Sequence, residues 1–553
     1  MNNSIKIFCK NTQEYVAVNG GDSLLDVLGV LELDMQPLCA LVNNKVVDLS
    51  FNIYSPKQVE FLDYSHPAGA RCYVHSLCMV LYKAITDLYP GKRLRIEHSL
   101  KGGYYCRIKH EHATLDASMV AALKAHMQEI IAQDLPLVRH EEPTQDVARL
   151  FEEQGLNDKV RVLSTCKDFY YTYYTLDNLA DAFYGPLVPR TGMLTSFDLL
   201  PYESGMILLA PDKDMQPAVA EKQPKMFKAF TDYVAFNDII GLGDVGILNK
   251  AIREKKAPML INVAEALHNK MFAAIAHEIA KRYQAGGARV VLIAGPSSSG
   301  KTTSSKRLAI QLVTNYIMPK VIELDNYFVN RDKTPRDESG DYDYESLYAL
   351  DLELFNSDLT RLLAGEEVAM PTYNFTTGSR EYRGNTLKLE KNNILLIEGI
   401  HGLNPELTKQ IPEEQKFRLY VSALTTLSID DHNWIPTSDN RLLRRIVRDN
   451  KYRGSNAQST IARWASVRRG EDKWIYPFQE NADATFNSSL IFELAVMKMH
   501  AEPVLRQVPV NSPEYAEAHR LLKFLNYFEP LDEKDIPSTS LLREFLGGSS
   551  FTY

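Results

Sequence analysis

Short runs of apolar residues alternate with helical stripes through the second half of the chain. Runs at residues 290–293 and 393–397 have the length and composition of buried strands, and residues 321–324 are predicted to form another strand. After the first run, Leu308, Leu312 and Val313 fall on one face of a helix over residues 304–313. Strands that alternate with such helices are typical of a parallel sheet with helices on both faces. We therefore expect residues 288–553 to form an α/β domain.

The first half of the chain has a different pattern. Over residues 1–63, alternation at Ile5, Ile7 and Cys9, a capped helix and two later strands predict a small β-grasp domain. Residues 64–210 begin with an amphipathic helix over 74–89 and predict a second, α+β domain. Residues 211–287 form a linker that ends in a connecting helix over 261–284, whose apolar stripe predicts packing against the α/β sheet. The stripe consists of Val263, Leu267, Met271, Ile275 and Ile279.

Composition narrows the function classes. At 553 residues the chain is too long for one core, and several domains are expected. The formal net charge of −8 provides no broad basic surface, so we expect no DNA partner and rank RNA binding low. We expect no membrane partner, because no long apolar run and no apolar signal segment occur. The cysteines form no CxxC pair, which favours free thiols and a cytoplasmic location; a homo-oligomer stays open.

A glycine-rich motif follows the first predicted strand directly. Residues 295–302 read Gly-Pro-Ser-Ser-Ser-Gly-Lys-Thr, the G-x-x-x-x-G-K-[ST] pattern of a phosphate-binding P-loop. In this motif backbone N–H groups bind phosphate oxygens, Lys301 reaches the outer phosphates and the Thr302 hydroxyl ligates Mg²⁺. The alternative is an accidental Ser/Gly turn, and the flanking strand and helix argue against it. We therefore predict ATP and Mg²⁺ as cofactors. The predicted ATP-binding residues of the loop are Gly295, Pro296, Ser297, Ser298, Ser299, Gly300, Lys301, Thr302 and Thr303.

Two carboxylates stand at the ends of predicted strands beside this loop. Asp325 follows the strand at 321–324, where a phosphoryl acceptor would lie, and we predict that it accepts the proton of the acceptor hydroxyl. The alternative is an aspartate that only caps a turn. Glu398 ends the strand at 393–397 and is predicted to hold Mg²⁺ or its water opposite Thr302, with a purely structural glutamate as the alternative. Asp325 is a further predicted metal contact.

An arginine-rich helix is predicted over residues 439–454. Arg441, Arg445 and Arg448 fall at i, i+4 and i+7 on one face, and the other side is apolar. A solvated basic face is the usual explanation of such a run. Because guanidinium groups bind phosphate bidentately and the run ends at Arg453 and Gly454, we favour a lid that closes over phosphates.

A series of motifs resembles, in order, those of the uridine kinase and phosphoribulokinase family. They are residues 295–303, Asp325-Asn-Tyr-Phe, Tyr342-Asp343, residues 373–380, Glu398-Gly-Ile-His and Arg445-x-x-Arg-Asp with Arg453-Gly. The resemblance implies catalysis by Asp325, Lys301 and Arg448, with Thr302 and Glu398 around Mg²⁺. It also implies that ATP contacts Arg445 and Arg453, and that the acceptor contacts Asp343, Tyr373, Arg380 and Arg445.

The first 210 residues are similar to a different family. The run Ala-x-Val-Asn…Val-x-Asp-Leu within residues 40–49, the helix over 74–89 and the stretch 181–192 resemble the TGS and editing domains of threonyl-tRNA synthetases. Those editing domains carry an HxxxH pair and a later Cys and His. The matching positions here are Arg71, His75, Phe183 and Leu187. Because a zinc site needs about four ligands, we expect a retained scaffold without zinc and without editing activity.

The acceptor stays open at this point. An ATP-dependent nucleoside kinase that acts on the 5′-hydroxyl of uridine or cytidine, as in pyrimidine salvage, is favoured. Asn374, Gly378 and Ser455 depart from the family pattern, which leaves the nucleobase preference open. A sugar phosphate or another nucleoside is the alternative acceptor, and the acidic run 341–345 favours a neutral one. An NTP-dependent RNA-binding or regulatory protein is the alternative of another class; the first 200 residues lack the basic block with interleaved aromatic residues that it would need.

Overall fold

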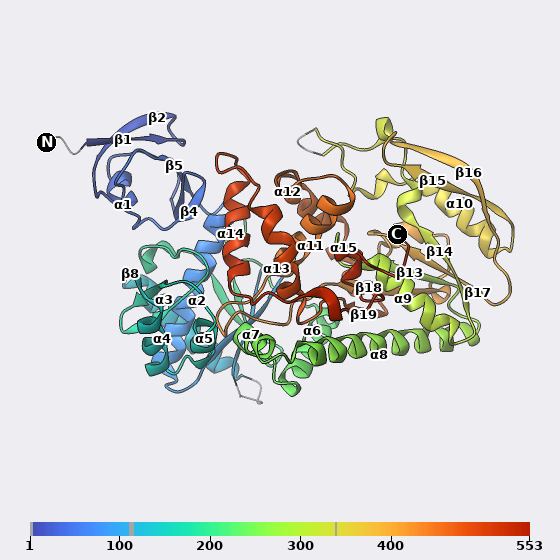
Figure 1. Ribbon diagram of the computed structural model, residues 1–553, viewed down its shortest axis with the longest axis horizontal. Helices are drawn as coiled ribbons and strands as arrows, with labels where there is room; N and C mark the ends of the chain where they lie inside the picture. The colour runs from blue at the N-terminus through green and yellow to red at the C-terminus, as the bar shows by residue number, and fades with distance from the viewer. Residues whose placement is uncertain (1–3, 110–114, 338–339, 553) are drawn as a thin grey trace.

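The computed structural model describes residues 4–109, 115–337 and 340–552. Figure 1 shows the N-terminal domains on one side, the α/β domain on the other, and helices α13 (Glu493–Leu505) and α14 (Tyr515–Asn526) between them. None of the described helices is long and apolar enough to cross a membrane. All six cysteines are free thiols, and five of them are buried.

The first domain is a five-stranded mixed sheet that packs against one short helix. Its strand order is β2-β1-β5-β3-β4, with β1 and β5 parallel, which is the β-grasp arrangement that the sequence pattern predicts. Ile7, Val18 and Val59 of the sheet meet Leu24 and Val27 of the helix in its core. The elements are β1 (Ser4–Cys9), β2 (Glu14–Asn19), α1 (Leu24–Leu28), β3 (Cys39–Val42), β4 (Lys45–Val47) and β5 (Gln58–Leu62).

The second domain packs the long helix α2 against two antiparallel sheets, ordered β11-β12-β7-β6 and β10-β9-β8. The sequence predicts α2 as an amphipathic helix over 74–89, but it begins earlier and is buried along most of its length. The reason is that both sheets, α3 and a loop of the α/β domain that carries Trp434 cover it. The elements are α2 (Pro67–Leu88), β6 (Leu94–Leu100), β7 (Gly103–Ile108), α3 (Ala117–Ala132), β8 (Leu137–Pro143), α4 (Thr144–Glu153), α5 (Asn157–Leu163), β9 (Tyr170–Leu176), β10 (Leu179–Asp181), β11 (Asp198–Tyr202) and β12 (Gly205–Leu209).

Three helices, α6 (Pro224–Ile239), α7 (Val245–Arg253) and α8 (Ala257–Gln284), join the two halves, and α8 runs along the lower edge of the molecule in Figure 1. The predicted stripe of α8 is wrong in part. Val263, Leu267 and Met271 are only half-buried, whereas Ile261 and Phe272 are fully buried. A series at every fourth residue rotates by about 40° per step on a helix of 3.6 residues per turn, so its five members cannot all lie on one buried face. Only the last two, Ile275 and Ile279, are buried.

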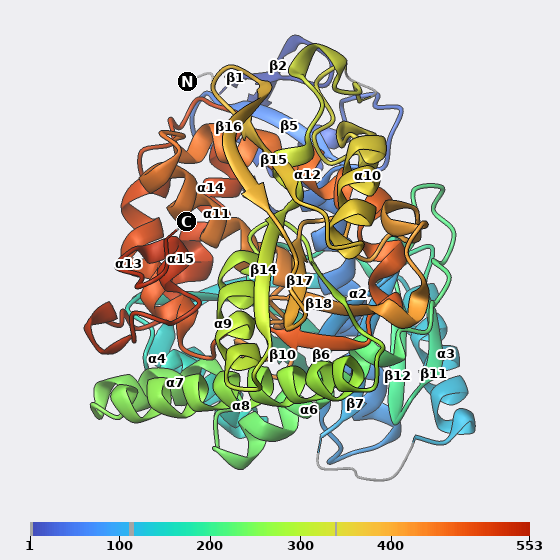
Figure 2. The same ribbon diagram turned by 90° about the vertical axis from the view of Figure 1, so that its right-hand side faces the viewer.

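The α/β domain is built on a parallel sheet of order β14-β17-β13-β18-β19. Figure 2 shows α9 beside strands β14 and β17, with α8 crossing below. Because β13, β14 and β17 are parallel, the loops that follow them emerge at the same carboxyl edge of the sheet. The elements are β13 (Val290–Ala294), α9 (Lys301–Val313), β14 (Met318–Glu323), α10 (Leu352–Leu363), the hairpin β15 (Val368–Asn374) and β16 (Ser379–Leu387), β17 (Asn393–Glu398), β18 (Lys416–Ser422), α11 (Thr437–Tyr452), α12 (Ala457–Trp474), β19 (Ala484–Asn487), α13, α14 and α15 (Arg543–Leu546).

Candidate active site

The predicted P-loop connects β13 to α9. Ser298 and Gly300 adopt left-handed backbone conformations, with φ of 58° and 87°. A Cβ on Gly295 would lie 2.0 Å from the carbonyl oxygen of Val421 on β18, so only glycine fits there. Nζ of Lys301, the first residue of α9, donates to the carbonyl oxygen of Pro296 at 3.2 Å. The loop therefore folds into the closed turn that phosphate binding by backbone N–H groups requires.

Thr302 and Glu398 meet beside this loop. The Thr302 hydroxyl lies 3.2 Å from each carboxylate oxygen of Glu398, the last residue of β17. Burial raises the pKa of Glu398 to about 7; Lys301 opposes the shift, and the carboxylates of Asp325 and Glu544 add to it. A half-buried carboxylate with a hydroxyl and further acids around it offers the hard oxygen ligands that Mg²⁺ prefers. The residues present therefore fit a magnesium ion at Thr302 and Glu398.

Asp325 lies directly after β14, in the short 3₁₀ helix Leu324–Tyr327. Its side chain is exposed to solvent, and the protein around it raises its pKa. The positive charges of Lys301, Arg453 and Arg448 act in the opposite direction. Asp325 accepts no side-chain hydrogen bond from the described residues, which argues against a purely turn-capping role. The structure thus brings the predicted base and the predicted phosphate-binding cations into one electrostatic group.

The arginine helix differs from its prediction. Arg441 is fully buried, where it pairs with Glu471 and donates from Nε to the Ser297 carbonyl oxygen at 2.9 Å. Arg444, which is not among the predicted site residues, is also fully buried, paired with Glu493 at 2.7 Å. The predicted basic face is wrong for Arg441, because Glu471 on α12 neutralises it in the interior. Both arginines donate hydrogen bonds to carbonyl oxygens of the P-loop, Arg441 to Ser297 and Arg444 to Ser298.

Arg445, Arg448 and Arg453 lie near the P-loop and Asp325. Nη1 of Arg445 donates to the Ser297 hydroxyl at 2.8 Å. All three arginines converge on Asp449, with Nε of Arg445 at 3.3 Å, Arg448 at 2.8 Å and Nε of Arg453 at 3.7 Å from its carboxylate. A single carboxylate can accept from only a few of the N–H groups of three guanidinium groups, so most of these N–H donors are available to another anion. The cluster is therefore suited to phosphate oxygens.

The predicted acceptor residues lie around the hairpin β15–β16 and the loop before α10. Tyr373 and Arg380 are opposite each other across this hairpin. Arg380 pairs with Asp351 at 2.9 Å, while the Tyr373 hydroxyl is buried without a hydrogen-bond partner among the described residues. Asp343 accepts from the Glu345 N–H at 3.1 Å, so one of its oxygens is used within its own turn.

Aromatic rings gather beside Asp325. The ring of Phe328 lies 5.5 Å from Tyr373 and 6.3 Å from both Phe375 and Tyr344, and Tyr373 lies 5.1 Å from Phe375. Phe375 is 61% exposed, so this group presents a free aromatic surface. Such a surface is suited to a flat ring such as a nucleobase.

Gly378 shows why the hairpin turn departs from the family pattern. It has a φ of 69°, and a Cβ there would lie 2.6 Å from Nε of Arg331. The Arg331 backbone N–H donates to the Gly378 carbonyl oxygen at 2.8 Å, and its Nη2 donates to the Phe375 carbonyl oxygen at 2.6 Å. A side chain larger than that of glycine at position 378 would therefore displace Arg331.

Three carboxylates near the loop were missed in the sequence. Glu471 accepts from the Ser297 N–H at 3.0 Å, and Glu544 accepts from the Thr303 N–H at 3.2 Å and from its hydroxyl at 2.6 Å. Glu345 lies against Gly470, within the electrostatic reach of Lys301 and Arg445. Burial and the nearby Glu471 raise its pKa to about 7. The acidic run 341–345 was a signal for Glu345, whereas Glu471 and Glu544 lie too far along the chain for any local pattern.

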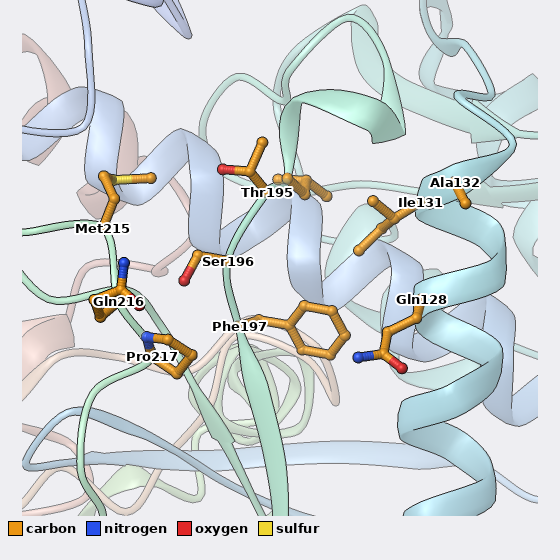
Figure 3. Close-up of a pocket in the computed structure, with 10 residues that line it drawn as sticks. Gln128, Ile131, Ala132, Thr195, Ser196, Phe197, Met215, Gln216 and Pro217 are labelled. Atoms are coloured by element: carbon orange, nitrogen blue, oxygen red, sulfur yellow. The ribbon is translucent and has the colours of Figure 1, made fainter.

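A pocket of about 370 Å³ lies elsewhere, between α3, the segment 194–197 of the second domain and the segment 215–217 that follows this domain (Figure 3). Its walls come from uncharged residues such as Gln128, Phe197 and Gln216. Without a cation or a helix N-terminus it offers nothing that favours phosphate.

The positions that correspond to an editing metal site are occupied by packing interactions. Arg71 pairs with Glu517 of α14 at 3.4 Å. The ring of His75 is stacked on Phe183 at 5.5 Å and lies 5.7 Å from the Trp434 ring, and Leu187 is buried. Burial lowers the pKa of His75 to about 3. Among the described residues, no group of three or more His, Cys, Asp or Glu side chains is arranged to hold a metal ion.

The two halves of the chain are similar to different known proteins. Residues 290–491 match the Phosphoribulokinase / Uridine kinase family. The N-terminal region resembles threonine–tRNA ligases: that of Clostridium kluyveri is 29% identical over 199 residues, which cover 35% of this chain and 31% of the ligase. That of Parabacteroides distasonis is 27% identical over 198 residues, covering 36% and 29%. The chain thus spans about a third of the length of these ligases. A solved structure described as a possible uridine kinase from Bacillus stearothermophilus is 22% identical and covers 36% of this chain and 89% of its own, with a TM-score of 0.25.

Proposed function

We propose that this chain, which joins a P-loop kinase domain of the phosphoribulokinase and uridine kinase family to threonine–tRNA ligase-like N-terminal domains, phosphorylates the 5′-hydroxyl of a nucleoside with ATP. The observation that carries the proposal is the meeting of Lys301, Thr302, Glu398 and Asp325 at the carboxyl edge of one parallel sheet. Phosphate binding, metal binding and proton acceptance are the tasks that phosphoryl transfer to a hydroxyl requires.

The P-loop and its neighbours would bind MgATP. Thr302 and Glu398 would hold Mg²⁺, which supplies charge neutralisation on the outer phosphates when bound. Lys301, now on the Pro296 carbonyl oxygen, would move onto these phosphates. Arg445, Arg448 and Arg453 would close over them, since their shared partner Asp449 leaves donors free.

Asp325 would orient the acceptor and accept its proton. The carboxylate stands next to the cations that bind the transferred group, so a hydroxyl hydrogen-bonded to it would face the terminal phosphorus. A base is useful only when ionised, and the neighbouring Lys301, Arg448 and Arg453 favour that form.

The aromatic group around Phe328 supports a nucleoside as acceptor. Phe328, Tyr373 and Phe375 offer stacking, and the carboxylates of Asp343 and Glu345 would accept hydrogen bonds from sugar hydroxyls. We favour uridine or cytidine, in pyrimidine salvage in the cytoplasm, without a nucleic-acid or membrane partner. A sugar phosphate is the second candidate. Nη1 of Arg380 and Nε of Arg331 are buried without a hydrogen-bond partner among the described residues, and an anion would satisfy them.

A coupled assay of ADP formation across a panel of nucleosides and sugar phosphates tests this proposal, with Asp325→Asn as the control for background ATP hydrolysis. We expect uridine or cytidine to have the highest kcat/KM, and the variant to lose that activity. Preference for a sugar phosphate would replace the nucleoside assignment with the second candidate. Absence of turnover with every acceptor would contradict both.

A further inference from the structure

A loop of the kinase domain is buried in the N-terminal half. Residues 423–436, here called the strap, connect β18 to α11, and every residue from 423 to 435 is buried. Loops normally run over the surface, because their polar groups need water. Trp434 of the strap belongs to the core of the second domain, where its ring lies 4.6 Å from Tyr104 and 5.7 Å from His75. The second domain therefore supplies part of the interior in which this loop folds, beside the core of the α/β domain, to which Leu427 and Ile429 belong.

The strap carries charged side chains in this interior, and charged residues of the second domain form ion pairs with them. Nζ of Lys159, only 2% exposed, lies 3.0 Å from Asp430 of the strap and 2.8 Å from Asp181. The other oxygen of Asp181 lies 2.6 Å from Nδ1 of His432. Burial by itself would raise the pKa of Asp181, but Lys159 and His432 lower it to about 2. Lys159 and Asp181 thus bind the strap at two positions, Asp430 and His432.

Asp431 is held by a second set of contacts. Its carboxylate lies 3.2 Å from Arg95 and 2.7 Å from Lys109, and its backbone N–H donates to Asp158 at 2.7 Å. The Ile96 N–H donates to the Asp431 carbonyl oxygen at 2.8 Å, which joins the strap to β6. Buried charges are stable only when paired, so the strap has one position in which all of them are satisfied.

The strap leads directly into the helix that holds the P-loop. α11 begins at Thr437, and within its first turns Arg441 donates to the Ser297 carbonyl oxygen at 2.9 Å. Arg444 donates to the Ser298 carbonyl oxygen at 3.3 Å. A shift of the strap would shift these arginines, and with them the backbone that must receive phosphate.

A series of ion pairs also connects the N-terminal half to α11. Arg71 of α2 lies 3.4 Å from Glu517 of α14, which also pairs with Arg520. Arg520 in turn binds both carboxylate oxygens of Asp439 on α11, at 2.6 and 2.9 Å. The start of α11 is therefore fixed from the N-terminal half along two routes.

We propose that the N-terminal half is a working part of the nucleotide site, and that Lys159 and Asp181 are positioning residues that fix α11 and the P-loop through the strap. The proposal rests on the proposed kinase function for its turnover readout. Its nucleotide-affinity readout does not depend on the acceptor.

The test compares the full-length protein with Lys159→Met, which keeps the length of the side chain and removes its charge. Arg149→Met is the matched control, because Arg149 is 72% exposed and pairs only on the surface of the same domain. Affinity for a fluorescent ATP analogue and kcat are measured well below each melting temperature, so that every sample is folded. Misplacing a site from a distance costs about ten- to a hundredfold, and we expect a loss of that order in affinity, kcat or both for Lys159→Met. We expect less than about a twofold change for Arg149→Met.

A role in stability alone gives a different result. Lys159→Met would then melt at a lower temperature but keep wild-type nucleotide affinity and kcat per folded molecule, and this would overturn the proposal. If Lys159→Met does not fold, Trp434→Phe carries the same test with a smaller change in the strap, and the same two results decide it. A wild-type protein that binds nucleotide but phosphorylates no nucleoside would contradict the proposed function, while the affinity comparison would still decide this inference.

Discussion

Replacing Asp325 by Asn removes a charge from the candidate active site and changes little else. The two side chains have nearly the same size, and the Asp325 carboxylate receives no hydrogen bond from the described residues that the amide would break. The P-loop from Gly295 to Thr303 is untouched. Asparagine cannot accept the acceptor proton at any working pH. The substitution therefore isolates the proposed role as base.

The size of the effect follows from the chemistry. A positioned general base contributes about 10² to 10⁴-fold, which is ~3 to 5 kcal/mol of transition-state stabilisation. We expect kcat to fall by that factor and the KM of the acceptor to change much less. The substitution is expected to lower turnover but not stability. Surrounding protein raises the pKa of Asp325, so the folded state binds the proton more tightly than the unfolded state, and ionisation at rising pH costs stability. Asn removes that cost, and because the side chain is open to solvent we expect a melting temperature that is unchanged or slightly higher.

The assay measures melting temperature, ATP affinity and kcat on one preparation of the variant. Turnover should fall while the fold and ATP binding persist, although Mg²⁺ affinity falls as well if Asp325 contacts the metal's water shell. A lower melting temperature with intact turnover per folded molecule would refute the reasoning. It would make Asp325 a structural turn residue and leave Glu398 as the candidate carboxylate among those predicted.

The other predictions concern the loop and the N-terminal half. Lys301→Ala should lower kcat by about 10²-fold or more, because transition-state charge on the outer phosphates loses its main side-chain partner; near-normal turnover would refute a catalytic P-loop. Glu345→Gln should tighten ATP binding about fivefold at pH 8 and hardly at pH 6, because Glu345, with its pKa raised to about 7, is charged and repels phosphate only at the higher pH; equal effects at both values would exclude this titration. Glu544→Ala should raise ATP affinity, since the carboxylate occupies the Thr303 N–H that a phosphate would bind; weaker binding in titration calorimetry would instead make Glu544 a support of the loop. Elemental analysis should find no stoichiometric zinc, because His75 alone remains of the four ligand positions; one zinc per chain would contradict that expectation.

The parts of this structure that the sequence predicts are those encoded locally. The strand, the glycine loop and the helix of the P-loop lie within one short segment, and Asp325 and Glu398 stand at the ends of predicted strands. Strand β17 is buried, whereas β14 is at the edge of the sheet, where Val321 is 46% exposed. Neighbouring parallel strands end at the same edge of the sheet, so the topology brings the P-loop, Asp325 and Glu398 together.

The parts that the sequence does not predict depend on partners far along the chain. Arg441 has the spacing of an exposed phosphate ligand and becomes buried because Glu471, on the next helix, neutralises it. No prediction from the sequence covers the strap, and nothing near Asp430 or His432 in the sequence indicates that Lys159 and Asp181 will contact them. Such pairings are fixed by tertiary packing, which local periodicity does not encode.

The most direct measurement of the central claim compares uridine with 5′-deoxyuridine as acceptors in one assay. The analogue has the same base and the same two remaining sugar hydroxyls but lacks the proposed acceptor oxygen. We predict ADP formation with uridine, a product whose phosphorus couples to the 5′ protons in ³¹P NMR, and no turnover with the analogue, which should instead inhibit competitively. Phosphorylation of 5′-deoxyuridine, or a uridine product phosphorylated at another position, would contradict the account.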